Sequence, residues 1–203
     1  MTPDGHYTSP QPERSALLTI DVQEDFAAPG APAEIAGTAA CLPAMGRVLE
    51  AYRKRGLPVV HVVRLYLEDG SNADVSRREA IERGARIVTP ESHGAELAAP
   101  LKPNPEFRLD AARLLSGNLQ ELGPDEWVMY KPRWDAFHGT PLLWHLRRLG
   151  VNTVVVAGCN FPNCPRATIY GASMRDFRIV LVTDAVSECT RKGSRNCAAS
   201  VRR

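Results

Sequence analysis

Short apolar runs recur along the chain, and stretches with helical periodicity separate them. Apolar side chains at successive positions are typical of strands buried on both faces, and such runs predict strands over residues 16–22, 57–63, 126–130, 153–157 and 178–183. Helical periodicity predicts helices over residues 43–55, 76–84, 140–149 and 165–176, with a last short helix after Thr190. Strands that alternate with helices favour a parallel sheet with right-handed crossovers. We therefore predict an α/β fold of three layers, α/β/α, around a Rossmann-like and mostly parallel sheet.

Residue types at the ends of these helices refine the boundaries. Ser76 and Glu79 have the spacing of a capping box, which predicts a helix start at Ser76. Thr140 followed by Pro141 is typical of a helix beginning, and Gly150 is typical of a helix end.

The segment 64–124 is long and rich in proline, and it shows only short periodic pieces. A structureless span of this length is rare in a compact domain, so we expect it to hold further short elements. Long excursions at the carboxyl ends of strands often cover a functional site. Residues 1–14 are expected to be a disordered lead, and residues 15–203 to form a single domain.

Composition narrows the classes of function. The chain has 203 residues and a net charge of +2, which gives no reason to expect nucleic acid or an anionic membrane as a partner. No apolar stretch approaches the roughly 20 residues of a membrane-spanning helix. Five cysteines without zinc-ligand or CxxC spacing are typical of free thiols in a reducing compartment, so we expect a cytoplasmic protein.

Three reactive residues follow predicted strands: Asp21, Lys131 and Cys164. The carboxyl ends of parallel strands meet at one edge of a sheet, so we expect these side chains to lie together. Cys164 stands at a predicted helix N-terminus, where free backbone N–H groups favour a thiolate. Asp21 can accept the thiol proton as a general base, and Lys131 can stabilise the thiolate, which would attack a carbonyl.

The sequence around these residues resembles a known family. Residues 21–26 read DVQEDF, residues 131–137 read KPRWDAF, and residues 157–168 read AGCNFPNCPRAT. In this order the three motifs are similar to those of the isochorismatase-like cysteine hydrolases, which include nicotinamidases and N-carbamoylsarcosine amidohydrolase. The resemblance implies an Asp-Lys-Cys triad that cleaves the C–N bond of a small amide through a thioester.

The resemblance also implies details around the triad. It implies a cis peptide bond at Cys159–Asn160 and an oxyanion hole made by the backbone amides of Asn160 and Cys164. No cofactor is implied, the partner is a small-molecule substrate, and the chain is expected to form a homo-oligomer, either a dimer or a tetramer. Nicotinamidases carry an Asp-x-His metal motif after the second strand, where this chain reads Arg64-Leu65-Tyr66, so we expect no metal site.

Aromatic residues near the motifs are candidates for a substrate pocket. We predict that it is lined by Phe26, Trp134, Phe137 and Phe161, although the family usually has a small residue or threonine at the position of Phe161. Arg64 and Arg133 either hold a substrate carboxylate or form salt bridges, and the sequence leaves both alternatives open.

Two other functions fit the same fold. One is an isochorismatase-type vinyl-ether hydrolase, in which Asp21 protonates the substrate and Cys164 is dispensable. The other is a non-catalytic binding subunit, in which Cys164 reacts no faster than an ordinary thiol. A dinucleotide-binding domain is excluded because no GxGxxG follows the first predicted strand.

Overall fold

The structure is a computed structural model that describes residues 7–189. A six-stranded sheet in the order β3-β4-β2-β1-β5-β6 forms its centre. Its strands are β1 (Ser15–Ile20), β2 (Val59–Val63), β3 (Gln120–Gly123), β4 (Glu126–Tyr130), β5 (Thr153–Gly158) and β6 (Arg178–Val186). All neighbouring strands pair in parallel except β3, which pairs antiparallel with β4 at the edge. The five predicted strands are confirmed, whereas β3 lies in a segment for which no strand was predicted.

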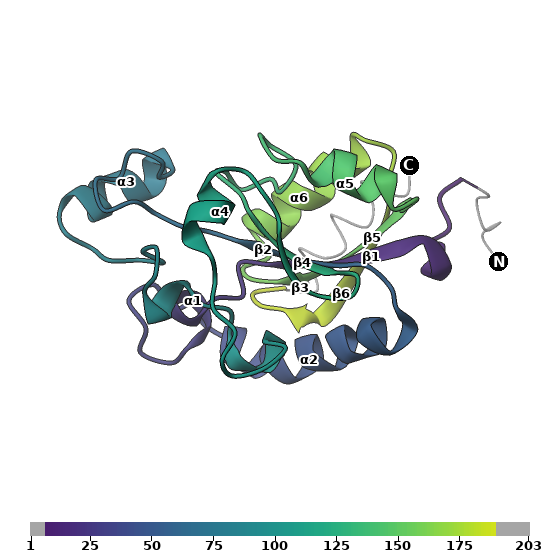
Figure 1. The fold of residues 1–203 in the computed structure, drawn as a ribbon, viewed down its shortest axis with the longest axis horizontal. Coiled ribbons are helices and arrows are strands. Elements are labelled where there is room, and N and C mark those ends of the chain that lie inside the picture. The colour runs from purple at the N-terminus through teal and green to yellow at the C-terminus, as the bar shows by residue number, and fades with distance from the viewer. Residues whose placement is uncertain (1–6, 190–203) are drawn as a thin grey trace.

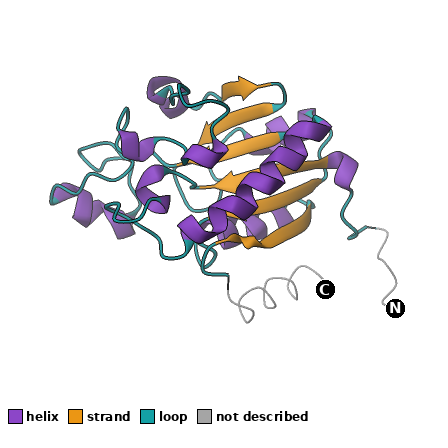
Figure 2. Ribbon diagram, turned by 90° about the horizontal axis from the view of Figure 1, so that it is seen from below, coloured by secondary structure: helices purple, strands orange, loops and turns teal. Residues whose placement is uncertain are grey.

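Helices cover both faces of this sheet. The α-helices are α1 (Glu24–Ala27), α2 (Thr38–Arg55), α3 (Val75–Glu82), α4 (Ala111–Leu115), α5 (Leu142–Arg148) and α6 (Cys164–Ser173). Short 3-10 helices are η1 (Pro12–Arg14), η2 (His93–Ala95) and η3 (Ala99–Leu101). Figure 1 shows α2 on one face and α5 and α6 on the other, and Figure 2 shows the long helix α2 lying across the strands. The predicted three-layer α/β/α fold with a mostly parallel sheet is confirmed.

The core is divided by the sheet because successive strand residues point to opposite faces. Leu18 and Ile20 of β1 belong to the cluster under α5 and α6, whereas Leu17 packs with Met45 and Leu49 of α2. A third cluster lies beneath the segment 64–124, which holds α3, η2, η3, α4 and β3. The expectation of further short elements in that segment is therefore confirmed.

The helix starts differ from the prediction. Helix α5 begins at Leu142, with Pro141 rather than Thr140 before its first residue, and α6 begins at Cys164 rather than Pro165. Helix α3 begins at Val75, with Asp74 rather than Ser76 before its first residue, and no side chain caps it. The capping-box prediction is wrong here because Ser76 already lies inside the helix. Helix α2 begins at Thr38 and includes Pro43, which forgoes one intrahelical hydrogen bond but does not end the helix.

The N-terminal lead is ordered in its last part. The Gln11 backbone N–H donates to Thr153 Oγ1 over 3.1 Å, and the Asn152 side chain donates to Gln11 Oε1. Residues 12–14 then form η1 before β1 begins. The expectation of disorder throughout residues 1–14 is therefore wrong for residues 11–14. The helix predicted after Thr190 lies outside the described residues.

Candidate active site

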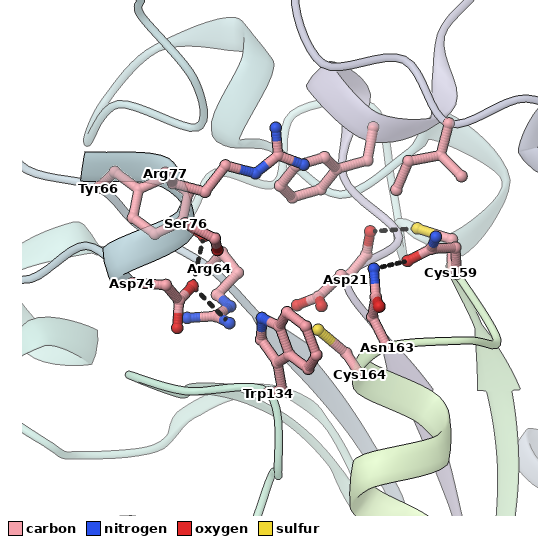
Figure 3. Close-up of a pocket in the computed structure, with 13 residues that line it drawn as sticks. Asp21, Arg64, Tyr66, Asp74, Ser76, Arg77, Trp134, Cys159, Asn163 and Cys164 are labelled. Atoms are coloured by element: carbon pink, nitrogen blue, oxygen red, sulfur yellow. Dashed lines mark hydrogen bonds and ion pairs between the residues drawn. The ribbon is translucent and has the colours of Figure 1, made fainter. Parts of the chain in front are cut away.

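The three reactive residues meet at the carboxyl edge of the sheet. Asp21 follows β1, Lys131 follows β4, and Cys164 is the first residue of α6, which comes after β5. Lys131 Nζ donates to Asp21 Oδ2 over 2.8 Å, and both residues are buried. Figure 3 shows the Cys164 sulfur beside the Asp21 carboxylate. The structure thus brings together the three residues that the strand pattern selected.

A close approach of two strands shapes the loop before Cys164. Gly158 ends β5 with φ +126°, and a Cβ atom there would lie 2.2 Å from the Ile20 carbonyl oxygen. Only glycine fits this position, because any side chain would collide with the backbone of β1. The predicted cis peptide bond between Cys159 and Asn160 follows directly and is present. The Cys159 thiol then donates to the Asp21 carbonyl oxygen over 2.9 Å, which ties this loop to β1.

The charge state of Cys164 is set by burial and by its neighbours. Burial raises the pKa of the Cys164 thiol to about 11, and the negative charge of Asp21 acts in the same direction. Lys131 and Arg64 lower this pKa but do not outweigh the other effects. The resting site therefore favours the neutral thiol. The sulfur is a neutral thiol at pH 7, so an attack on a carbonyl requires a base.

Asp21 has the features that such a base needs. Its Oδ2 accepts from Lys131, while its buried Oδ1 has no hydrogen-bond partner among residues 7–189. An unpartnered buried carboxylate oxygen is unfavourable, so a proton donor or a ligand is expected to satisfy it. The arrangement can move a proton from the thiol to Asp21.

Two backbone donors adjoin the thiol. In the described part of the chain, no hydrogen-bond acceptor takes the backbone N–H of Asn160 or of Cys164. Both residues line the same cavity, and the Cys164 amide belongs to the free N–H groups at the start of α6. These amides can donate to an oxygen atom that enters the cavity.

A cavity of about 250 Å³ opens beside Cys164 (Figure 3). Phe26 and Trp134 line it, and Trp134 is 42% exposed. Tyr66 and Arg77 of the segment 64–124 also line it. The volume suits a small molecule rather than a polymer.

The other two predicted pocket residues lie elsewhere. Phe137 and Phe161 are buried in the cluster under α5 and α6 and are not among the residues that line the cavity. Phe137 packs against Phe177 with 5.7 Å between ring centroids. The Phe161 backbone N–H donates to the Ser187 carbonyl, which ties its loop to the end of β6. Both residues pack in the core and do not line this cavity.

The two sequence-selected arginines have different contacts. Arg64 is buried in the cavity wall, where it donates to Asp74 Oδ2 over 2.9 Å and to the Pro132 carbonyl over 2.9 Å. Burial opposes its charge, but the proximity of Asp21 raises the pKa of Arg64, so it remains a cation beside the thiol. Arg133 is exposed and donates to backbone carbonyls. Arg64 therefore forms a salt bridge.

Sequence reasoning missed Arg77. It lies on α3 within a polar stretch that resembles none of the family motifs, so neither periodicity nor motif spacing distinguishes it from its neighbour Arg78. Only the path of the chain from β2 to α3 brings Arg77 to the cavity.

Residues 7–189 show neither a cluster of metal ligands nor a membrane-spanning helix. No group of three or more His, Cys, Asp or Glu side chains in this range is arranged to hold a metal ion. No helix in the same range combines the length and apolar character needed to cross a membrane.

Fold and site together define an α/β protein of the isochorismatase-like hydrolase class. Residues 15–202 match the Isochorismatase domain, and the chain belongs to this family. It is 32% identical to a probable inactive nicotinamidase of Arabidopsis thaliana, over 87% of this chain and 82% of that protein. It is 28% identical to the ureidoacrylate amidohydrolase of Methylobacterium radiotolerans, over 87% and 68% of the two chains.

A solved structure supports the same assignment. An isochorismatase family protein from Desulfovibrio vulgaris superimposes with a TM-score of 0.77 and is 35% identical to this chain. The match covers 94% of this chain and 90% of the other, so the whole fold is shared.

Proposed function

We propose that this protein hydrolyses the C–N bond of a small amide through a thioester on Cys164. The observation that carries the proposal is the buried ion pair between Asp21 and Lys131. The Asp21 carboxylate lies beside the Cys164 thiol, and its Oδ1 has no hydrogen-bond partner among residues 7–189. A buried ion pair is weak evidence for stability alone, whereas a carboxylate with one free oxygen beside a thiol has a chemical use.

The first half of the reaction forms the thioester. Asp21 Oδ1 takes the proton of Cys164 as the sulfur attacks the carbonyl carbon, because the resting thiol is neutral. The carbonyl oxygen becomes an oxyanion and accepts hydrogen bonds from the backbone N–H groups of Asn160 and Cys164. Protonated Asp21 then gives its proton to the leaving nitrogen, the C–N bond breaks, and ammonia or an amine departs.

The second half releases the acid. A water molecule gives a proton to Asp21 and attacks the thioester carbon, the C–S bond breaks, and the proton returns to the sulfur. Lys131 offsets the charge of the Asp21 carboxylate throughout and holds Oδ2, which leaves Oδ1 to carry protons. No step requires a cofactor.

The names of the relatives support amide chemistry but include a protein described as probably inactive, so activity must be measured. The test is ammonia release from a panel of small amides by the wild type, Cys164→Ser and Asp21→Asn. We expect release by the wild type and a loss of about a hundredfold or more in each variant, the scale of general base catalysis. Cys41→Ser, which alters a thiol outside the cavity, is the matched control and keeps the wild-type rate.

The same variants separate the competing functions. Pyruvate release from isochorismate that survives in Cys164→Ser would establish the vinyl-ether reaction and contradict our proposal. Absence of ammonia from every amide, together with absence of pyruvate from isochorismate, would establish a non-catalytic subunit. A cytoplasmic homo-oligomer, dimer or tetramer, remains a prediction that light scattering and cell fractionation address.

A further inference from the structure

Arg77 places a positive charge, unpaired among the described residues, at the cavity beside Cys164. It lies on α3, is half-buried, and lines the cavity. Within the described residues, its guanidinium group has no hydrogen bond or ion pair. In Figure 3 this group lies above the cavity, across from Trp134 and Cys164. A guanidinium that faces a cavity without a partner is available to a ligand.

The other charged groups around the cavity satisfy one another. Lys131 pairs with Asp21 at 2.8 Å, and Arg64 pairs with Asp74 at 2.9 Å. Asp74 also accepts from the Tyr66 hydroxyl. Two anions and two cations therefore cancel, and the charge of Arg77 is left over. A ligand that brings one negative charge could pair with this guanidinium group.

We propose that Arg77 binds a carboxylate of the substrate, so that the preferred substrates are short amides that carry a carboxylate away from the scissile bond. A planar guanidinium group binds a carboxylate through two parallel hydrogen bonds, which fixes orientation as well as position. The Ser76 hydroxyl also lines the cavity and supplies a neighbouring donor. The assignment of an amide rests on the proposed function, whereas the carboxylate site itself does not.

Amide hydrolysis tests the preference when the probes differ only in charge. Succinamate and its methyl ester share the same primary amide, and only the first carries a carboxylate. We expect the wild type to have the higher kcat/KM on succinamate. In Arg77→Gln the ratio of the two kcat/KM values falls about tenfold or more, the scale of hydrogen bonds to a charged group. Arg77→Lys retains part of the preference for succinamate, because lysine keeps the positive charge but lacks the planar guanidinium group.

A control arginine on the same helix separates this effect from a general change in charge. Arg83 pairs with Glu79 on the exposed side of α3 and does not line the cavity. Arg83→Gln removes the same charge and leaves the ratio unchanged. A fall in the Arg83→Gln ratio equal to that of Arg77→Gln would overturn the assignment.

Alkylation of Cys164 tests the carboxylate site without any turnover. Iodoacetate and iodoacetamide form the same S–C bond and release iodide, but only iodoacetate is an anion. We expect Arg77→Gln to lower the ratio of the iodoacetate rate to the iodoacetamide rate at Cys164 about threefold or more, measured on the separated peptide by mass spectrometry. Arg83→Gln leaves this ratio at the wild-type value.

The two readouts distinguish the two proposals. If no amide is hydrolysed but the alkylation ratio falls in Arg77→Gln, the proposed function fails and the carboxylate site stands. If amides are hydrolysed and both ratios are unchanged in Arg77→Gln, the carboxylate site is overturned and the hydrolase stands. If neither hydrolysis nor a change in the alkylation ratio is observed, both proposals are overturned.

Discussion

The Lys131 ammonium group lies 2.8 Å from Asp21 Oδ2, and the two residues are 0% and 4% exposed. Burial of two charges is unfavourable unless each compensates the other. Asp21 approaches from the end of β1 and Lys131 from the end of β4, with β2 between these strands. The sheet therefore holds the pair in place, and each partner depends on the other.

Lys131→Met tests this dependence. The substitution keeps much of the side-chain volume but leaves the Asp21 carboxylate buried without a counter-ion. We expect the free energy of unfolding to fall by about 3–5 kcal/mol, measured by urea denaturation. Lys54→Met is the control, because Lys54 forms an exposed pair with Glu50, and its loss is expected to leave stability unchanged. Equal stability of the two variants would show that the buried pair contributes nothing.

Gly158→Ala tests the close approach of β5 to β1. The new Cβ would lie 2.2 Å from the Ile20 carbonyl oxygen at a φ of +126°. We therefore expect the free energy of unfolding, measured by urea denaturation, to fall by about 3 kcal/mol or more. Gly84→Ala is the matched control, because Gly84 has φ +99° and no atom within 4 Å of its Cβ position. It isolates the backbone strain, which we expect to be about 1 kcal/mol. Similar losses at both positions would contradict the steric argument.

Several elements of this site could be predicted from sequence, for a physical reason. A buried parallel strand leaves a clear apolar run, and polar residues that follow such runs must gather at one edge. Asp21 and Lys131 were therefore placed together although 110 residues separate them. The sequence neighbours of Cys164 likewise placed it at the start of a helix.

Other parts could not be predicted, because they depend on the path of loops. Phe161 and Phe137 are aromatic residues next to motifs, and sequence does not tell whether such a ring faces a cavity or the core. In the structure both rings lie in the core, in a cluster that includes residues of α6 and β6. Arg77 reaches the cavity only through the loop before α3, and β3 is an edge strand with alternating burial, too short to leave a pattern.

The pH dependence of Cys164 alkylation tests its electrostatic environment. The pKa of the thiol is raised to about 11, so the rate with iodoacetamide should keep rising above pH 9 in the wild type. Asp21→Asn removes a negative charge that disfavours the thiolate, so the pKa falls and the profile shifts to lower pH. Lys131→Met removes a positive charge and shifts the profile to higher pH. Profiles that coincide in all three proteins would contradict the assigned neighbours.

Acid stability tests a second network of charged groups, at the start of β4. Burial favours the neutral form of Glu126, but hydrogen bonds from Arg53 and His61 lower its pKa from 4.5 to about 2. A carboxyl group with a lowered folded-state pKa stabilises the fold above its unfolded pKa, and this stability is lost as the pH falls through the folded pKa. We therefore expect the free energy of unfolding to decrease between about pH 4.5 and pH 2.

Glu126→Gln should flatten this dependence, because the amide does not titrate. Glu121→Gln on the neighbouring edge strand β3 is the control, since Glu121 is exposed and has no ion pair among residues 7–189. Urea denaturation of the three proteins across this pH range provides the measurement. A wild-type slope as shallow as that of Glu126→Gln would show that Glu126 is not the titrating group.

The most direct test of the central claim is the mass of the protein during turnover. Wild-type protein is mixed with the panel of small amides, quenched in acid within the first turnovers, and measured intact and after digestion. We predict a gain equal to the mass of the acyl group, located on the peptide that contains Cys164 and absent in Cys164→Ser. Hydrolysis by Cys164→Ser at the wild-type rate, or a wild-type adduct on Cys159 instead of Cys164, would contradict the account.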